Sequence, residues 1–169
     1  MTSERTSGPV QRALLFTLFV PGTATVAVPA LLLTRVTEPW PFDLGPFRFA
    51  GLPVLAAGAV LGLWCIVDFV RVGRGTPAPW DPPARLVTRG PYVWVRNPMY
   101  AGVLLVVAGE AVLYESGLLA VYAGALFLAF HLFVRFHEEP NLRRRFGDDY
   151  GRYLSSTPRW LPRPPVTGP

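Results

Sequence analysis

The sequence predicts an all-α integral membrane protein with about four transmembrane helices. Hydrophobic residues make up 51% of the 169 residues and charged residues 16%, whereas soluble domains carry roughly a quarter charged residues. The apolar residues gather in four runs, at 13–33, 49–70, 99–114 and 117–136, and about 20 apolar residues suffice to cross a bilayer. No strand alternation or internal repeat is visible, so residues 1–169 are interpreted as a single membrane domain.

The first two runs are long enough to span a membrane. Residues 13–33 carry no charge, and membrane helices tolerate the two prolines, Pro21 and Pro29. Arg5 and Arg12 precede this run as they would in a signal peptide, but the run exceeds the usual apolar length of about 7–15 residues, so we expect an uncleaved span. Residues 49–70 form the second span.

The last two runs predict an antiparallel helical hairpin. Only Glu115 and Ser116 separate residues 99–114 from residues 117–136, which leaves room for a tight turn alone. Sixteen helical residues measure about 24 Å, short of an upright crossing of a hydrocarbon core about 30 Å thick. The hairpin is therefore not expected to stand upright across the whole membrane.

The arginines predict the orientation. All 16 basic residues are arginines, and a cytoplasmic N-terminus places 14 of them inside and leaves Arg35 and Arg48 outside. This bias follows the positive-inside rule and predicts a multi-pass plasma (inner) membrane protein with both termini cytoplasmic. The loop at 71–98, rich in proline, is then an extended cytoplasmic segment, and so is the tail at 137–169, whose helix is expected to end near Gly147 or Gly151.

The net charge of +5 is also typical of proteins that bind nucleic acid. We exclude this function because the arginines are interleaved with hydrophobic spans. Cys65 is the single cysteine of the chain, which excludes a disulfide framework and a cysteine-based zinc site. We predict no metal.

Two polar patterns lie on the cytoplasmic side. Asn97 and Pro98 suit a helix start, which would present free amides to an anion beside Arg96; the alternative is a helix start with no ligand. His131, Arg135 and Glu138 follow at i, i+4 and i+7 and are expected on one helix face, with Glu139 beside it. The alternatives are a core histidine, a snorkelling arginine and solvated glutamates.

Further candidates are one intramembrane acid and a group of aromatic residues. Glu110 lies in the outer half, roughly 7 Å from the outer turn, whereas His131 lies roughly 21 Å from it. We therefore interpret Glu110 as a structural hydrogen-bonding group or a protonated acid, outside the site. The aromatic residues form either an interfacial belt or a cage for a planar or cationic ligand: Tyr92, Trp94, Tyr100, Tyr150, Tyr153 and Trp160.

Three segments of the sequence are similar to segments of a known protein family. They are Leu86-Val87-Thr88-Arg89-Gly90-Pro91-Tyr92, Arg96-Asn97-Pro98-Met99-Tyr100-Ala101-Gly102, and Glu138-Glu139-Pro140 followed by Leu142, Phe146-Gly147, Tyr150, Tyr153 and Pro158-Arg159-Trp160. In order and spacing they resemble the isoprenylcysteine carboxyl methyltransferase and phospholipid methyltransferase superfamily, which are integral-membrane enzymes that use S-adenosylmethionine. The similarity covers about residues 85–162.

The resemblance implies a helical membrane fold, a cofactor bound at the cytoplasmic face and a lipophilic substrate that enters from the bilayer. By position it implies a cofactor site that includes Gly90, Tyr92, Arg96, Asn97, Pro98, Tyr100, Gly102, Glu138 and Glu139. Many relatives have histidine where this chain has Asn97, and asparagine cannot titrate.

The chemistry of these residues fits S-adenosylmethionine. Glutamates accept from its ammonium or ribose hydroxyls, Arg96 suits its carboxylate, and tyrosines suit its sulfonium and adenine. A carboxylate or thiol acceptor would need a positive clamp such as Arg135 or Arg159, whereas an amine would need a base such as His131 or an acid. No glycine-rich dinucleotide loop is present, which excludes a Rossmann-type methyltransferase.

Two other classes of function remain open from the residues. One is a small four-helix proton-coupled transporter that uses Glu110, and the other is a non-catalytic membrane scaffold. The long cytoplasmic loop and tail have little use in a transporter, and binding of S-adenosylhomocysteine would separate the methyltransferase from both.

Overall fold

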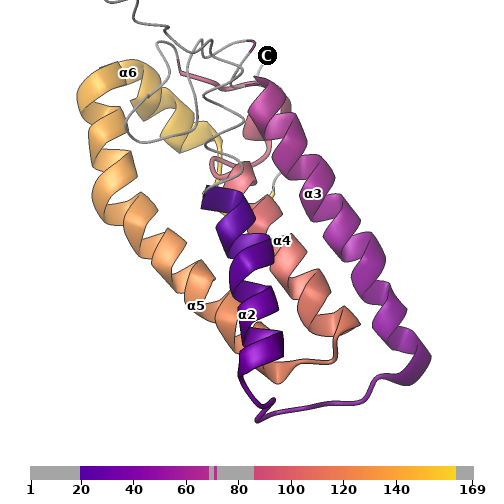
Figure 1. The fold of residues 1–169 in the computed structure, drawn as a ribbon. Coiled ribbons are helices and arrows are strands. Elements are labelled where there is room, and N and C mark those ends of the chain that lie inside the picture. Colours follow the sequence, from indigo (N-terminus) through magenta and orange to yellow (C-terminus); the bar gives the residue numbers. More distant parts are fainter. Residues whose placement is uncertain (1–19, 69–70, 72–85, 163–169) are drawn as a thin grey trace, which may run out of the picture.

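Four helical segments run side by side, and a fifth turns back across one end of them (Figure 1). The computed structural model describes residues 20–68, 71 and 86–162. The start of the predicted first span, the middle of the loop at 71–98 and both chain ends lie outside the described residues, together with Arg5, Arg12, Arg74, Arg85 and Arg163.

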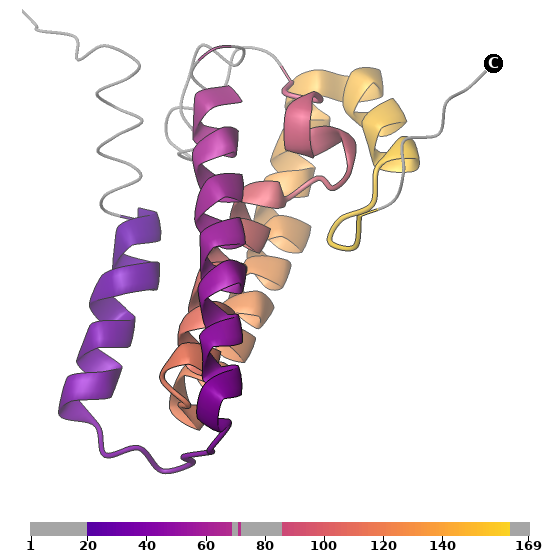
Figure 2. The ribbon, with the colours of Figure 1, turned by 90° about the vertical axis from the view of Figure 1, so that its right-hand side faces the viewer.

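The first segment consists of a π-helical turn, η1 (Thr23–Ala27), and α2 (Val28–Arg35). A 3-10 turn, η2 (Gly45–Ala50), leads into α3 (Gly51–Asp68), and another, η4 (Gly90–Val93), precedes α4 (Pro98–Leu113). The chain then continues through α5 (Gly117–Phe133), a π-helical turn η5 (Val134–Glu138) and α6 (Glu139–Ser156). The predicted hairpin of α4 and α5 is confirmed, and α2 stands apart from α3 (Figure 2).

The apolar helices leave most of their surface uncovered by protein. The helical stretches Gly45–Asp68 and Gly117–Ser156 have windows of mean hydropathy 2.1, of which 17% and 11% of the residues are buried inside the protein. Val20–Arg35 and Pro98–Leu113 are shorter apolar helices. Exposed apolar faces of this extent suit lipid and not water, so the predicted all-α membrane class is confirmed.

Glycines bring α3 and α4 into backbone contact. A Cβ on Gly58 would lie 2.6 Å from the carbonyl oxygen of Gly102, and a Cβ on Gly109 would lie 2.6 Å from the amide nitrogen of Leu55. Small residues at such crossings let membrane helices approach closely. Gly102, which the resemblance implies is a cofactor residue, therefore also has a packing reason to be glycine.

Glu38 and Glu115 connect the loop between α2 and η2 to the hairpin turn. Glu38 accepts from the Ser116 hydroxyl and from the Leu118 amide at 3.1 Å, so it caps the start of α5. These hydrogen bonds, the one from Ser116 foremost, hold the pKa of Glu38 below its usual range. Glu115 accepts from the Leu44 and Gly45 amides at 2.7 and 3.1 Å.

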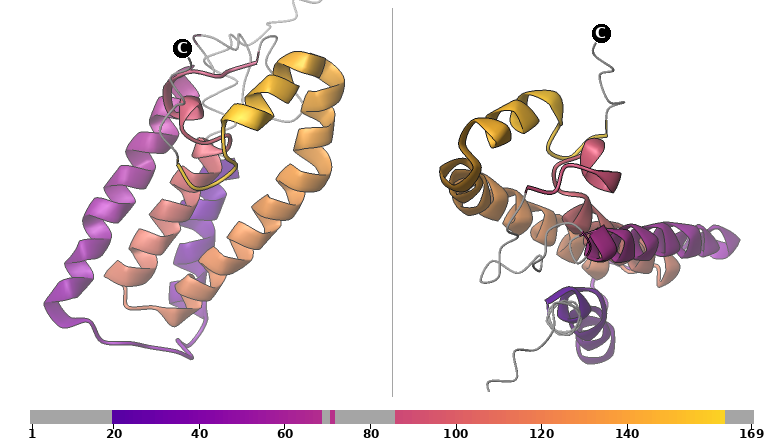
Figure 3. Two further views of the ribbon diagram at one scale, coloured as in Figure 1. Left: turned by 180° about the vertical axis from the view of Figure 1, so that it is seen from behind. Right: turned by 90° about the horizontal axis from the view of Figure 1, so that it is seen from above.

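The tail helix differs from its predicted end. Gly147 has non-helical angles (φ 51°, ψ −125°), as expected of a helix terminator, but the chain resumes a helix that reaches Ser156. The break turns α6 back over the end of the bundle where α4 begins (Figure 3). Residues 157–162 then reach the start of α4, where the Arg96 amide donates to the Pro158 carbonyl at 2.9 Å.

The α3–α4 contact predicts a contrast between two alanine substitutions on one helix. Gly58→Ala places a methyl group against backbone atoms and should lower the free energy of unfolding by about 1–3 kcal/mol. Gly62→Ala is the matched control, because a Cβ there has nothing within 4 Å and alanine favours a helix by up to about 1 kcal/mol. Thermal unfolding in detergent, followed by circular dichroism, measures both, and equal effects would contradict the packing described.

Candidate functional site

One carboxylate joins two arginines from distant parts of the chain. Glu139, at the start of α6, accepts from Arg96 Nη1 at 2.9 Å and from Arg159 Nε and Nη2 at 2.8 and 2.9 Å. The side chains of Glu139, Arg96 and Arg159 are 15%, 11% and 23% exposed, respectively. We call these three residues the Glu139 cluster. Its bidentate, charge-assisted hydrogen bonds are among the strongest that side chains form.

The polypeptide backbone reinforces this cluster. Asn97 Nδ2 donates to the Arg159 carbonyl at 3.2 Å. Asn97 is the N-cap of α4, as predicted, but its side chain makes no hydrogen bond to the helix amides because its amide group faces residue 159. The tail is thus held beside the helix start, where the sequence predicted an anion site.

The second acid, Glu138, faces α4. Its Oε2 accepts from the Tyr100 hydroxyl at 3.1 Å, and Tyr100 packs on Phe130 with ring centroids 4.7 Å apart. Burial raises the pKa of Glu138, the Tyr100 hydrogen bond opposes that rise, and the nearby Glu139 charge adds to it. Its other oxygen, Oε1, accepts no hydrogen bond from the described residues, so a ligand can use it.

Three tyrosines pack around the base of the cluster. Tyr153 donates to the Tyr92 carbonyl at 2.7 Å, which ties α6 to η4, and Tyr150 lies beside it with ring centroids 6.2 Å apart. Burial raises the pKa of each of them, so all three remain neutral phenols at physiological pH. Gly90 begins the same turn with φ +59° and has Asp68 against it, so a side chain there would clash.

His131 contacts the tail directly. Its Nδ1 accepts from Trp160 Nε1 at 3.1 Å. Because an indole nitrogen can only donate, neutral His131 carries its proton on Nε2. The histidine therefore holds Trp160 in place and presents a donor at its free nitrogen.

Arg135 is not brought into the cluster. It is exposed, and its guanidinium lies 5.7 Å from the Phe136 ring centroid. In η5, which follows α5, the Glu139 amide bonds to the Val134 carbonyl five residues back. A π-helical turn holds more residues than an α-helical one, so it changes the register of Glu138 and Glu139 relative to His131.

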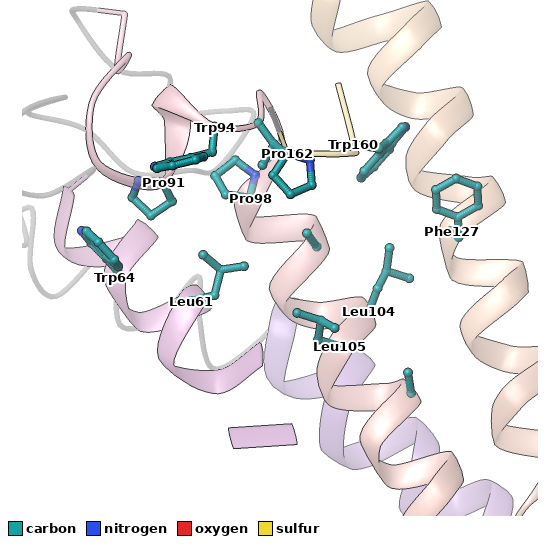
Figure 4. A pocket seen from close by; sticks show the side chains of 13 residues that line it. Leu61, Trp64, Pro91, Trp94, Pro98, Leu104, Leu105, Phe127, Trp160 and Pro162 are labelled. Atoms are coloured by element: carbon teal, nitrogen blue, oxygen red, sulfur yellow. The ribbon is translucent and has the colours of Figure 1, made fainter. Parts of the chain in front are cut away.

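An apolar cavity of about 580 Å³ adjoins the cluster (Figure 4). Its walls come from α3, η4, α4, α5 and the tail, and its lining consists of Leu61, Trp64, Pro91, Trp94, Val95, Pro98, Ala101, Leu104, Leu105, Ala108, Phe127, Trp160 and Pro162. The volume falls in the range of small-molecule sites, about 300–1,000 Å³. Trp160 lines this cavity while its neighbour Arg159 belongs to the Glu139 cluster.

Sequence reasoning missed most of the cavity lining. Leu61, Leu104 and Phe127 resemble any other lipid-facing apolar residue, and no sequence signal distinguishes them. Glu110 lies near the hairpin-turn end of α4, away from the cluster, and its Oε2 is buried without a hydrogen-bond partner among the described residues. A hydrogen-bonding role for that oxygen therefore has no support.

These features define an α-helical membrane protein with a charged cluster beside an apolar cavity at one end of its bundle. The model of the phospholipid methyltransferase family matches residues 46–149, more than half of the chain, and the protein belongs to this family. The match includes α3, which precedes the three segments that carry the resemblance. No curated protein matches the chain in sequence.

The Glu139 cluster predicts a large cost for removing its central charge. Glu139→Gln leaves two largely buried guanidiniums without a carboxylate and should lower the free energy of unfolding by about 1–3 kcal/mol. The control is Asp149→Asn, which breaks the exposed ion pair with Arg152 and should change stability little, because exposed pairs contribute almost nothing. Unfolding curves in detergent that coincide for the two variants would contradict this account.

Proposed function

We propose that the protein is an S-adenosylmethionine-dependent methyltransferase that acts at the cytoplasmic face on a lipophilic or membrane-embedded small substrate. The observation that carries the proposal is the junction at residues 159 and 160, where a polar cluster suited to the methyl donor meets an apolar cavity suited to the acceptor. The arginine distribution supports the cytoplasmic location and four spans with both termini inside.

The chemistry of the donor set fits the cofactor. Arg96 Nε is buried and has no hydrogen-bond partner among the described residues, and a carboxylate is a suitable partner for it. Glu138 Oε1 suits an ammonium or a ribose hydroxyl. Glu139, whose oxygens already bind two arginines, positions these groups. Tyr100 and Tyr150 supply neutral aromatic faces of the kind that attract cations.

When bound, S-adenosylmethionine supplies an electrophilic methyl group, which passes to a heteroatom of the acceptor while the sulfur keeps the bonding electrons. The chain supplies alignment and exclusion of water. The cavity wall excludes water, and the His131 bond fixes Trp160 at its edge. Arg159 is engaged with Glu139, so it positions the tail and is not a free clamp for an anionic acceptor.

His131 is poorly placed as a base in this arrangement. Its Nδ1 lone pair is occupied by Trp160 and its Nε2 carries a proton, so it can accept a proton only after the Trp160 bond breaks. This favours an acceptor that reacts without deprotonation by His131. A transporter that uses Glu110 and a non-catalytic scaffold remain the alternatives, and neither needs the unpartnered Arg96 Nε beside the Glu139 cluster.

Binding of S-adenosylhomocysteine tests the proposal. Calorimetry on the purified protein in detergent should show saturable binding that weakens at least about tenfold in Glu138→Ala, because a charged hydrogen bond contributes about 1.5–3 kcal/mol. Glu110→Ala is the matched control and should bind normally. Absence of binding to the unmodified protein would overturn the methyltransferase assignment, and loss in Glu110→Ala alone would favour the transporter.

The raised pKa of Glu138 predicts a pH dependence of that binding. The carboxylate is the form that accepts from the cofactor, and burial makes it protonate at a higher pH than an ordinary glutamate. Affinity should therefore fall with decreasing pH while still above 4.5, the ordinary pKa of glutamate. In Glu138→Gln this acidic decline should be absent and affinity low throughout, whereas a decline that persists in the variant would assign it to another group.

A further inference from the structure

Three consecutive arginines form a basic surface on α6. We call Arg143, Arg144 and Arg145 the arginine triplet, and each of them is exposed. Arg96 and Arg159 differ from them, because both are mostly buried and donate to Glu139. The triplet is therefore positive charge that the candidate site does not use.

Two contacts orient the triplet, and both are with uncharged groups. Arg144 Nη2 donates to the Asn141 side-chain oxygen at 3.0 Å. The Arg145 guanidinium lies 5.6 Å from the Phe146 ring centroid. The acid that follows, Asp148, lies past the helix break and is itself exposed. These contacts hold the guanidiniums at the surface without neutralising them.

The exposed apolar side of α5 indicates where the membrane lies relative to the triplet. Val121, Leu128, Leu132 and Phe136 are all exposed, and their spacing of i, i+7, i+11 and i+15 places them on one side of the helix. An uncovered apolar stripe of this kind suits lipid. Phe136 is its last member and stands beside the exposed Arg135, so the hydrocarbon boundary lies near these two residues.

The triplet lies a short distance beyond this boundary. Arg143 follows Phe136 by two helical turns on one continuous helical stretch (Figure 1), and the triplet is about 10–14 Å further along the helix axis. The headgroup region of one leaflet is about 5–7 Å deep, and the field of its charges extends about 8 Å further at physiological ionic strength. The arginines are therefore within reach of a charged membrane surface.

We propose that the arginine triplet docks on anionic phospholipid headgroups, in the leaflet at the end of the bundle where α4 begins. Charge complementarity carries the inference, because guanidiniums bind phosphate through paired hydrogen bonds and each arginine beside an anionic membrane strengthens the attraction about fivefold. The occupant is a lipid surface because the triplet directly continues a helix whose apolar stripe faces lipid. The inference depends on the membrane class of the protein and not on its proposed activity.

Electron paramagnetic resonance tests this in bilayers and needs no turnover. The full chain is reconstituted in phosphatidylcholine vesicles with a trace of spin-labelled phosphatidylglycerol or spin-labelled phosphatidylcholine, and the motionally restricted fraction of each probe measures its association with the protein. Because the signal averages over all surrounding lipids, phosphatidylglycerol should be preferred at least about threefold at physiological ionic strength. The preference should decline in about 1 M salt, where the screening length falls to about 3 Å.

Matched variants assign the preference to the triplet. Arg143→Gln, Arg144→Gln and Arg145→Gln combined should remove at least about half of it, since glutamine keeps a helix-forming polar side chain. For single changes, Arg144→Gln should lower the preference, whereas Arg152→Gln should not, because Arg152 is exposed on the same helix but already paired with Asp149. Circular dichroism checks that each variant is folded. An unchanged preference in the triple variant, or equal losses in the two single variants, would overturn the proposal.

Inorganic phosphate distinguishes a membrane surface from a site for a soluble anion. Millimolar phosphate, added at constant ionic strength, should leave the probe preference unchanged, because a free anion lacks the lipid chains that hold a headgroup beside the helix. Loss of the preference in phosphate would assign the triplet to a soluble anion and overturn the docking surface. Neither outcome bears on S-adenosylhomocysteine binding, so the proposed function is tested separately.

Discussion

The arrangement of the end of the bundle where α4 begins depends on one carboxylate, Glu139, shared by two guanidiniums. Arg96 precedes α4, Glu139 begins α6 and Arg159 follows α6, so a single acid holds together three segments that the chain order separates. Such ion pairs are weak evidence for stability, because desolvation offsets much of the attraction. Their stronger effect is on specificity. A planar guanidinium that meets a carboxylate through two hydrogen bonds accepts few geometries, so the pair with Arg159 sets where the tail lies.

The π-helical turn η5 is what allows two consecutive acids to serve different partners. In a regular α-helix, Glu138 would continue the line of His131 and Arg135. The wider turn shifts both acids relative to His131, and Glu138 faces Tyr100 while Glu139 faces the arginines. Single π turns inside α-helices often occur at functional sites. Here the turn separates the acid with a free oxygen from the acid whose oxygens are fully engaged.

Local patterns predicted much of the fold and less of the site. The apolar runs predicted α3, α4 and α5 to within a few residues, and the short spacing at Glu115 and Ser116 predicted the hairpin, because both depend on nearby residues alone. Asn97 was predicted as an N-cap but not as a donor to residue 159, since that contact depends on how the tail returns after Gly147. The register break at η5 leaves no mark in the 3.6-residue pattern, so the different partners of Glu138 and Glu139 could not be predicted. The cavity lining could not be predicted because lipid-facing and cavity-facing side chains share one chemistry.

The adjacency of Arg159 and Trp160 couples the two halves of the site through a single peptide unit. Arg159 is held by Glu139 and Trp160 by His131, so the tail is anchored on α6 and on α5 at successive residues. A change that releases Arg159 from Glu139 also loosens the indole that forms the cavity wall. Conversely, a change that displaces Trp160 also displaces the tail segment that pairs with Glu139. The geometry of the polar cluster and the geometry of the cavity wall are thereby linked, and such linkage is reciprocal.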